Sequence, residues 1–310
     1  MDEPKSGSNL EKILEAGHFA FTGELGPPRG TNVEAVRKKC AFLKGNVDMV
    51  NVTDNQTAVV RMSSIAGAKL LLDEGLEPVM QMTCRDRNRI AMQSDILGAY
   101  GLGLNTMLCL SGDHPSFGDH PMAANVHDLD SIQLIQMVRG MMDDGKFQGG
   151  ADIKRPPKMF IGAAANPFGD PFELRVLRLA KKVAAGADFI QTQCIYNMPK
   201  FREYMKMSVD MGLHEKTAIL AGVTPLKSAG MAKYMATKVP GMDVPDEIVK
   251  RIAGAPKEKQ AEEGIKFLCE QVEEMREIEG IAGIHLMAIE WEHKVPEILE
   301  QAKLLPRPQV

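Results

Sequence analysis

Residues 105–113 read NTMLCLSGD, a short apolar run that ends in a small polar turn. Its centre, 107–110, is apolar throughout, and a similar run, HLMAI, lies at 285–289. Strands buried on both faces have this composition, and they are typical of parallel sheets. The chain has eight such predicted strands, at 19–24, 47–53, 78–83, 105–111, 159–164, 188–193, 217–221 and 283–290.

Longer amphipathic stretches separate the predicted strands. Residues 32–44 and 257–279 place apolar side chains at three- and four-residue spacing, as in helices that cover a sheet. A further helix is predicted near 128–144. Another is predicted to begin at Asp170, which would cap its first turn, with Pro171 inside that turn.

This alternation of strands and helices is compatible with two fold classes. Eight strands, each followed by a helix, indicate an α/β protein with a (β/α)8 TIM barrel, and residues 1–310 are expected to form this one domain. A doubly wound sheet alternates in the same way and stays open. The strand count and the lack of a G-x-G-x-x-G fingerprint favour the barrel. Residues 114–158 would form a long connection between the fourth and fifth predicted strands, and it would begin with a functional loop.

The composition excludes several classes of protein. The 310 residues carry a net charge of −4, which argues against a nucleic-acid surface. No apolar run reaches the ~18 residues that span a bilayer. The start of the chain resembles no signal peptide. Because the sequence ends at Val310, no additional C-terminal regulatory domain is expected. The five cysteines are scattered without a C-x-x-C pair, so a reduced cytoplasmic protein is expected.

The predicted strand ends carry the polar residues that a barrel active site needs. In such barrels the active site lies at the C-terminal ends of the strands. Those ends hold Glu24, Thr53, Asp54, Thr83, Cys84, Asp113, Asn166, Gln193, Pro225 and Glu290. Glu24 and Asp113 are the candidate acid–base pair, because burial and neighbouring charge can leave one of two carboxyl groups able to donate a proton. Alternatively, each carboxylate caps a helix or binds a backbone amide.

One helix carries a basic face. Arg175, Arg178 and Lys182 recur at helical spacing after the fifth strand, with Lys181 beside them. Such a face is either solvated or, held on a rigid helix, positions a phosphate group. No P-loop competes for the second role.

The histidines offer little further chemistry. Three His–Asp neighbours lie within 113–128, but their spacing matches no defined zinc motif, so no metal is predicted. His285, inside the last predicted strand, is expected to be a barrel-interior histidine rather than a base.

Seven short motifs follow one another in a recognisable order. They are GELGPPR (23–29), NVT (51–53), MTC (82–84), LSGD (110–113), AANP (164–167), KKVAAGAD (181–188) and QTQ (191–193). Each motif is weak alone, but all seven fall at predicted strand ends or on the basic helix. Together they resemble the methylenetetrahydrofolate reductase family over essentially the whole chain.

The resemblance implies an oxidoreductase of one-carbon metabolism and methionine biosynthesis, a flavoprotein with FAD or FMN. It would reduce 5,10-methylenetetrahydrofolate to 5-methyltetrahydrofolate by hydride transfer from reduced flavin. The family's general acid falls on Glu24, its strand-four aspartate between flavin and folate on Asp113, and its pterin-contacting glutamine on Gln193, so all three would contact substrate. The flavin-binding positions fall on Thr53, Asp54, Gln81, Ser111, Gly112, Asp113, Asn166, Asp170, Arg178, Lys181 and Lys182.

Three departures from the family pattern concern the electron donor and the folate tail. Many members have Arg where this chain has Ser111, and an aromatic residue where it has Ala229. An arginine that holds the folate tail is replaced around 290–292. We therefore expect a partner subunit with iron–sulfur or flavin centres, rather than NAD(P)H, to reduce the flavin, as in the family's branch in anaerobic one-carbon metabolism. An oligomer is also expected.

Two other functions stay open at this point. A pterin-dependent methyltransferase barrel would share the fold and folate binding but would need no flavin. A non-catalytic barrel subunit of a larger redox complex would need neither Glu24 nor Asp113.

Overall fold

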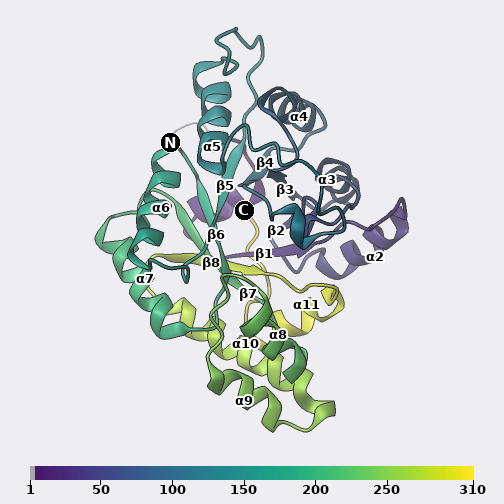
Figure 1. Cartoon of the computed structure of the whole chain (residues 1–310), viewed down its shortest axis with the longest axis vertical. Coiled ribbons are helices and arrows are strands. Elements are labelled where there is room, and N and C mark those ends of the chain that lie inside the picture. The colour runs from purple at the N-terminus through teal and green to yellow at the C-terminus, as the bar shows by residue number, and fades with distance from the viewer. Residues whose placement is uncertain (1–3) are drawn as a thin grey trace.

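The structure, a computed structural model that describes residues 4–310, contains a closed barrel of eight parallel strands (Figure 1). The strands are β1 (Ala20–Leu25), β2 (Met49–Val52), β3 (Pro78–Thr83), β4 (Thr106–Leu110), β5 (Phe160–Ala165), β6 (Phe189–Cys194), β7 (Ala218–Val223) and β8 (Ile281–Leu286). They pair in chain order, and β8 pairs with β1 to close the barrel. The predicted (β/α)8 barrel is confirmed, and a doubly wound sheet is excluded.

Helices surround the barrel on its outer side (Figure 1). The α-helices are α2 (Val33–Leu43), α3 (Ser64–Asp73), α4 (Arg89–Gly101), α5 (Ser131–Arg139), α6 (Glu173–Ala184), α7 (Met198–Asp210), α8 (Ala229–Lys238), α9 (Asp246–Gly254), α10 (Gln260–Arg276) and α11 (Val295–Gln301). The short helices are η1 (Gln56–Ala58), η2 (Pro115–Phe117), the π-helix η3 (Gly140–Asp144), η4 (Lys257–Lys259) and η5 (Glu292–Lys294). Val36, Cys40 and Leu43 of α2 are buried in the core, as the helical spacing of 32–44 predicted.

A helix that the sequence patterns did not indicate, α1 (Asn9–Glu15), packs on an apolar layer inside the barrel. Leu10 and Ile13 of α1 belong to one buried cluster with the inward-facing residues of the first strand halves. In that cluster Phe160 and Phe189 stack with ring centroids 5.3 Å apart. A Cβ at Gly162 would lie 2.3 Å from the Phe189 ring, so only glycine fits there. This apolar floor leaves the polar chemistry to the opposite end of the barrel.

The boundaries of several predicted elements differ from those in the structure. β8 ends at Leu286 rather than 290, and Ile289 and Glu290 adopt left-handed φ values of 39° and 57°, which no strand can accommodate. The helix predicted over 128–144 begins at Ser131, behind a capping box, and continues as the π-helix from Gly140. Asp170 does not cap α6. That helix starts at Glu173 without a side-chain cap.

The turn before α6 is held by Arg175 rather than by Asp170, the residue that the sequence suggested. The Arg175 guanidinium donates hydrogen bonds to the carbonyls of Gly169 and Asp170, at 2.8 and 2.9 Å. A long side chain that reaches back from the first turn therefore fixes this entry, instead of the aspartate that precedes it.

A buried ion pair ties the C-terminal segment to the barrel. Arg307 donates to both carboxylate oxygens of Asp48, at 2.9 and 2.6 Å, and Asp48 also accepts the Phe21 amide. Arg307→Leu would leave the Asp48 charge buried without its partner. We expect a loss of about 3–5 kcal/mol in the free energy of unfolding, measured by urea denaturation.

Arg37→Leu serves as the matched control for that variant. Arg37 pairs with Glu34 and Glu74 on the exposed face of α2, so its loss should change the free energy of unfolding little. Equal losses in the two variants would contradict a structural role for the Arg307 pair.

Candidate active site

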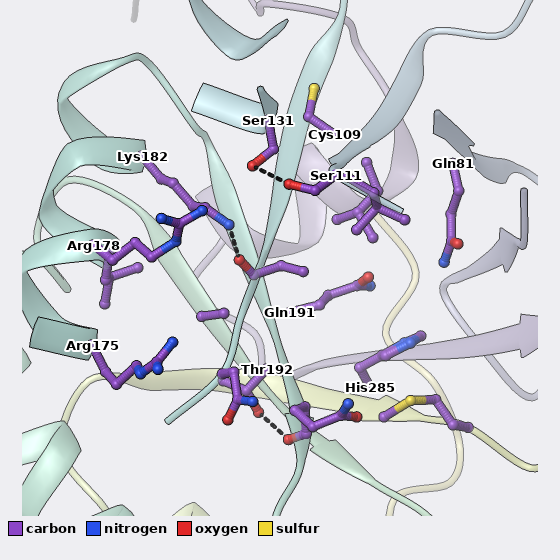
Figure 2. A pocket seen from close by; sticks show the side chains of 18 of the residues that line it. Gln81, Cys109, Ser111, Ser131, Arg175, Arg178, Lys182, Gln191, Thr192 and His285 are labelled. Atoms are coloured by element: carbon purple, nitrogen blue, oxygen red, sulfur yellow. Dashed lines mark hydrogen bonds between the residues drawn. The ribbon is translucent and has the colours of Figure 1, made fainter. Parts of the chain in front are cut away.

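A cavity of about 380 Å³ lies at the C-terminal ends of the strands, and Figure 2 shows the side chains that line it. Its walls come from β1, β3, β4, β5, β6 and β8, with one side formed by α6. The predicted site residues that it brings together are Glu24, Gln81, Ser111, Asn166, Arg178, Lys182 and Gln193. The position of the cavity thus agrees with the end of the barrel that the sequence indicated.

Glu24, at the end of β1, is the carboxyl group that faces this cavity. Its side chain is 9% exposed and accepts no hydrogen bond from residues 4–310. His285 of β8 lies beside it, with Nε2 3.7 Å from Oε2 of Glu24, and it also lines the cavity. A carboxyl group with one histidine neighbour and an open side toward a cavity has the arrangement that a general acid needs.

A buried polar layer supports His285 from below. Its Nδ1 lies 3.0 Å from Oγ1 of Thr22, and Thr22 accepts a hydrogen bond from Nε2 of Gln191 at 3.1 Å. Gln191 in turn forms two hydrogen bonds with Asn51, of 2.6 and 3.0 Å. Strands β1, β2, β6 and β8 therefore share one hydrogen-bonded layer between the apolar floor and the cavity.

The α6 side of the cavity is cationic. Figure 2 shows Arg175, Arg178 and Lys182 along this side, and no carboxylate of residues 4–310 forms an ion pair with them. Lys182 is 8% exposed and donates a hydrogen bond to the carbonyl of Ala164. Burial, and then the nearby Arg178 charge, lower the pKa of Lys182 from 10.5 to about 8. Three cations that form no ion pair within residues 4–310 make a wall suited to an anionic ligand.

Several predicted residues lie outside this cavity. Within the described part of the chain, those that do not line it are Thr53, Asp54, Gly112, Asp113, Asp170 and Lys181. Asp54 is buried and bonded to the Thr83 amide at 2.9 Å and to Arg87 at 2.6 Å, so its carboxylate is fully engaged in the scaffold. Lys181 is exposed, because it lies one position from Lys182 on α6.

Asp113 is not brought into the cavity beside Glu24. It is exposed, and its carboxylate accepts the backbone amide of Thr57 at 2.9 Å. The preceding Gly112 has φ +90°, and a Cβ there would lie 3.0 Å from Arg85, so this turn needs glycine. Thr53 is buried and does not line the cavity, and its hydroxyl has no hydrogen-bond partner among residues 4–310.

The sequence predictions assigned no site role to several other residues of the cavity wall. They are Leu108, Cys109, Leu110, Ser131, Ala164, Ala165, Leu179, Gln191, Thr192 and Met287. Gln191 could have been found from the alternation of a strand, because it is two positions from Gln193 and faces the same way. Ser131 could not, because it belongs to α5 and reaches the site through a 3.3 Å contact with Ser111.

The histidine-rich segment holds no candidate metal centre. Across residues 4–310, no group of three or more His, Cys, Asp or Glu side chains could hold a metal ion. Asp119 pairs with Arg29 and His120, and Asp128 with Arg89, so these carboxylates stabilise the loops. In the same residues, no helix has both the length and the apolarity to cross a membrane.

The fold and the cavity place the chain in the class of (β/α)8-barrel proteins with a polar ligand site at the C-terminal strand ends. The family profile described as methylenetetrahydrofolate reductase matches residues 9–303, and the chain belongs to that family.

Named relatives match the chain over most of its length. Methylenetetrahydrofolate reductase 2 of Schizosaccharomyces pombe is 25% identical over 321 residues, 96% of this chain and 47% of the relative. Methylenetetrahydrofolate reductase (NADH) 1 of Arabidopsis thaliana is 21% identical over 97% of this chain and 51% of its own length. The chain thus spans about half the length of the curated relatives it matches.

A solved structure shares the fold. It is a Clostridium thermocellum protein described as binding two copies of 5-methyl-5,6,7,8-tetrahydrofolic acid, with a TM-score of 0.65 and 14% identity. The match covers 96% of this chain and 99% of that one.

Proposed function

We propose that this chain reduces 5,10-methylenetetrahydrofolate to 5-methyltetrahydrofolate, with Glu24 as the general acid. The observation that carries the proposal is the buried Glu24 carboxyl, which faces a cavity with a cationic wall in a chain of this family. Opening the five-membered ring of the substrate requires a proton at the departing nitrogen. Glu24 would donate that proton, and the resulting carboxylate would lie beside His285.

The cationic wall supports a flavin as the cofactor. A bound flavin would supply the hydride that the reduction needs. Arg178 and Lys182 would hold its phosphate groups, since their charges have no carboxylate partner in the described residues. These features suit FAD and FMN alike, and the family resemblance favours FAD.

We also propose that a partner subunit, rather than NAD(P)H, supplies the electrons. Ala229, where the family pattern has an aromatic residue, is the first residue of α8, and its amide is bound to Gln260 at 2.9 Å. No β7 side chain of the described structure lines the cavity, so no ring from this side is available to stack on a nicotinamide. Five free cysteines support a reducing, cytoplasmic setting for such a complex.

Anaerobic reduction of the purified protein tests the proposal. We expect a yellow protein with absorbance at about 450 nm, whose dithionite-reduced form is reoxidised by methylenetetrahydrofolate with stoichiometric formation of methyltetrahydrofolate. NADH should reduce it slowly. A colourless protein that binds folate but forms no methyltetrahydrofolate would contradict the reductase and favour the methyltransferase alternative.

A further inference from the structure

The polar layer below Glu24 is unusual for a barrel interior, which is ordinarily filled by branched apolar side chains. Thr22, Asn51, Gln191 and His285 are each no more than 3% exposed. Polar groups at this depth are costly unless they are hydrogen-bonded, and here each one has a partner. The layer is therefore a specified network, and its hydrogen bonds have a direction.

The side-chain amides of Gln191 and Asn51 set which groups donate and which accept in this network. Oε1 of Gln191 accepts from Nδ2 of Asn51, while Nε2 of Gln191 donates one hydrogen to Oδ1 of Asn51 and the other to Oγ1 of Thr22. In this arrangement both hydrogens of the Gln191 amide are used. Thr22 is thereby an acceptor toward Gln191, and its own proton has to go elsewhere.

Two acceptors are within reach of the Thr22 hydroxyl. The Ile284 carbonyl lies at 3.5 Å, at the limit of a hydrogen bond, whereas Nδ1 of His285 lies at 3.0 Å. The hydroxyl proton therefore goes to Nδ1. A neutral imidazole that accepts at Nδ1 carries its hydrogen on Nε2, the nitrogen that faces Glu24.

We infer that Gln191 is a positioning residue, which fixes through Thr22 the tautomer of His285 that presents an N–H group to Glu24. The inference rests on the proposed role of Glu24 as the acid. The 3.7 Å separation of Nε2 and Oε2 exceeds a hydrogen bond, and such contacts often tighten when substrate binds. With Oε2 held by this N–H, the proton for the departing nitrogen is carried on Oε1 of Glu24, and the same N–H stabilises the carboxylate left behind.

Gln191→Glu tests the direction of the network. At a pH at which the new carboxyl group is ionised it can only accept hydrogen bonds, so Thr22 must donate to it. Nδ1 of His285 then becomes the donor to Thr22, and Nε2 loses its hydrogen. In ¹⁵N-histidine-labelled protein, with the His285 signals assigned by His285→Asn, we expect the protonated nitrogen to change from Nε2 to Nδ1.

Asn51→Asp is the matched control, since it adds the same group to the same layer. In its protonated form the new carboxyl group donates to Oε1 of Gln191, as Nδ2 of Asn51 does, so the Gln191 donation to Thr22 stays in place and the wild-type tautomer should persist. Should Gln191→Glu fail to fold, Thr22→Val is expected to give mixed tautomers and Thr22→Ser to restore the wild-type signals. Unchanged signals in Gln191→Glu or in Thr22→Val would overturn the inference.

Activity gives the second readout. Loss of the Nε2–H toward Glu24 should lower kcat of Gln191→Glu by about tenfold with KM nearly unchanged, because positioning acts on proton transfer rather than on binding. The same loss of kcat without a tautomer change would also overturn the inference. If wild-type protein forms no methyltetrahydrofolate, the proposed function fails, and the ¹⁵N signals alone decide the role of Gln191.

Discussion

Glu24→Gln is expected to lower the rate of methylenetetrahydrofolate reduction by about 10²–10⁴-fold, the usual contribution of a positioned general acid. The amide has nearly the shape of the carboxyl group, so the cavity wall and its neighbour His285 should stay in place. It cannot release a proton to the departing nitrogen. Stopped-flow reoxidation of the reduced protein by methylenetetrahydrofolate measures the effect, since it isolates this half of the reaction from the electron donor.

Two controls separate an acid from a residue that only shapes the cavity. Glu24→Gln should keep its flavin, because Glu24 is on β1, whereas the proposed phosphate wall is on α6. Glu274→Gln changes an exposed carboxylate that pairs with Arg202 outside the cavity, and its rate should stay within about twofold of the wild type. A Glu24→Gln rate above about one tenth of the wild-type rate would contradict the acid assignment.

The strands of the barrel could be predicted because a strand buried on both faces consists almost entirely of apolar residues. β4 shows this clearly, since its apolar centre at 107–110 lies inside the predicted strand. The end of β8 could not be predicted in this way. Met287 and Ile289 continue the apolar run, but the left-handed backbone at Ile289 and Glu290 ends the strand, and hydropathy carries no information on φ.

Helix α1 was missed for a related reason. Its seven residues are too few for a periodic pattern, and its apolar residues are satisfied only by the end of a barrel that forms elsewhere in the chain.

The site residues that were predicted well lie on regular elements, where side-chain direction follows from spacing. Glu24 and Gln193 end inward-facing rows of strands, and Arg178 and Lys182 share one face of α6. Residues beyond the strand ends behave differently, because distant partners set their direction. Asp54 forms an ion pair with Arg87, and Asp113 accepts a hydrogen bond from the Thr57 amide. Neither partner could be predicted from the local sequence. Their proposed roles toward a flavin stay predictions.

Lys182 should make the affinity for an anionic ligand depend on pH. Its pKa of about 8 in the ligand-free protein means that the cation is present below pH 8 and is lost as the pH rises. A charge-assisted contact to phosphate contributes about 1.5–3 kcal/mol, which corresponds to about 10–100-fold in the dissociation constant. Flavin fluorescence titrations from pH 7 to 9.5 should therefore show affinity falling once the pH passes about 8.

Lys182→Gln and Lys181→Gln separate this effect from a general change in charge. Lys182→Gln should bind flavin about 10–100-fold more weakly at pH 7, with little further loss at higher pH. Lys181→Gln removes an exposed charge one position away, outside the cavity, and should keep the wild-type affinity and pH dependence. Equal losses in the two variants would show that only the net charge of α6 matters.

The stability of the ligand-free protein offers an independent check on the same lysine. The pKa of Lys182 is about 8 in the folded state, against an ordinary value of 10.5, so the unfolded chain binds more protons between these pH values. Stability therefore rises from pH 8 to 10.5, by up to about 3 kcal/mol relative to Lys182→Gln. Urea unfolding of both proteins across this range measures the difference. Parallel curves would mean that burial does not oppose the Lys182 charge, and that the pH-dependent affinity has another source.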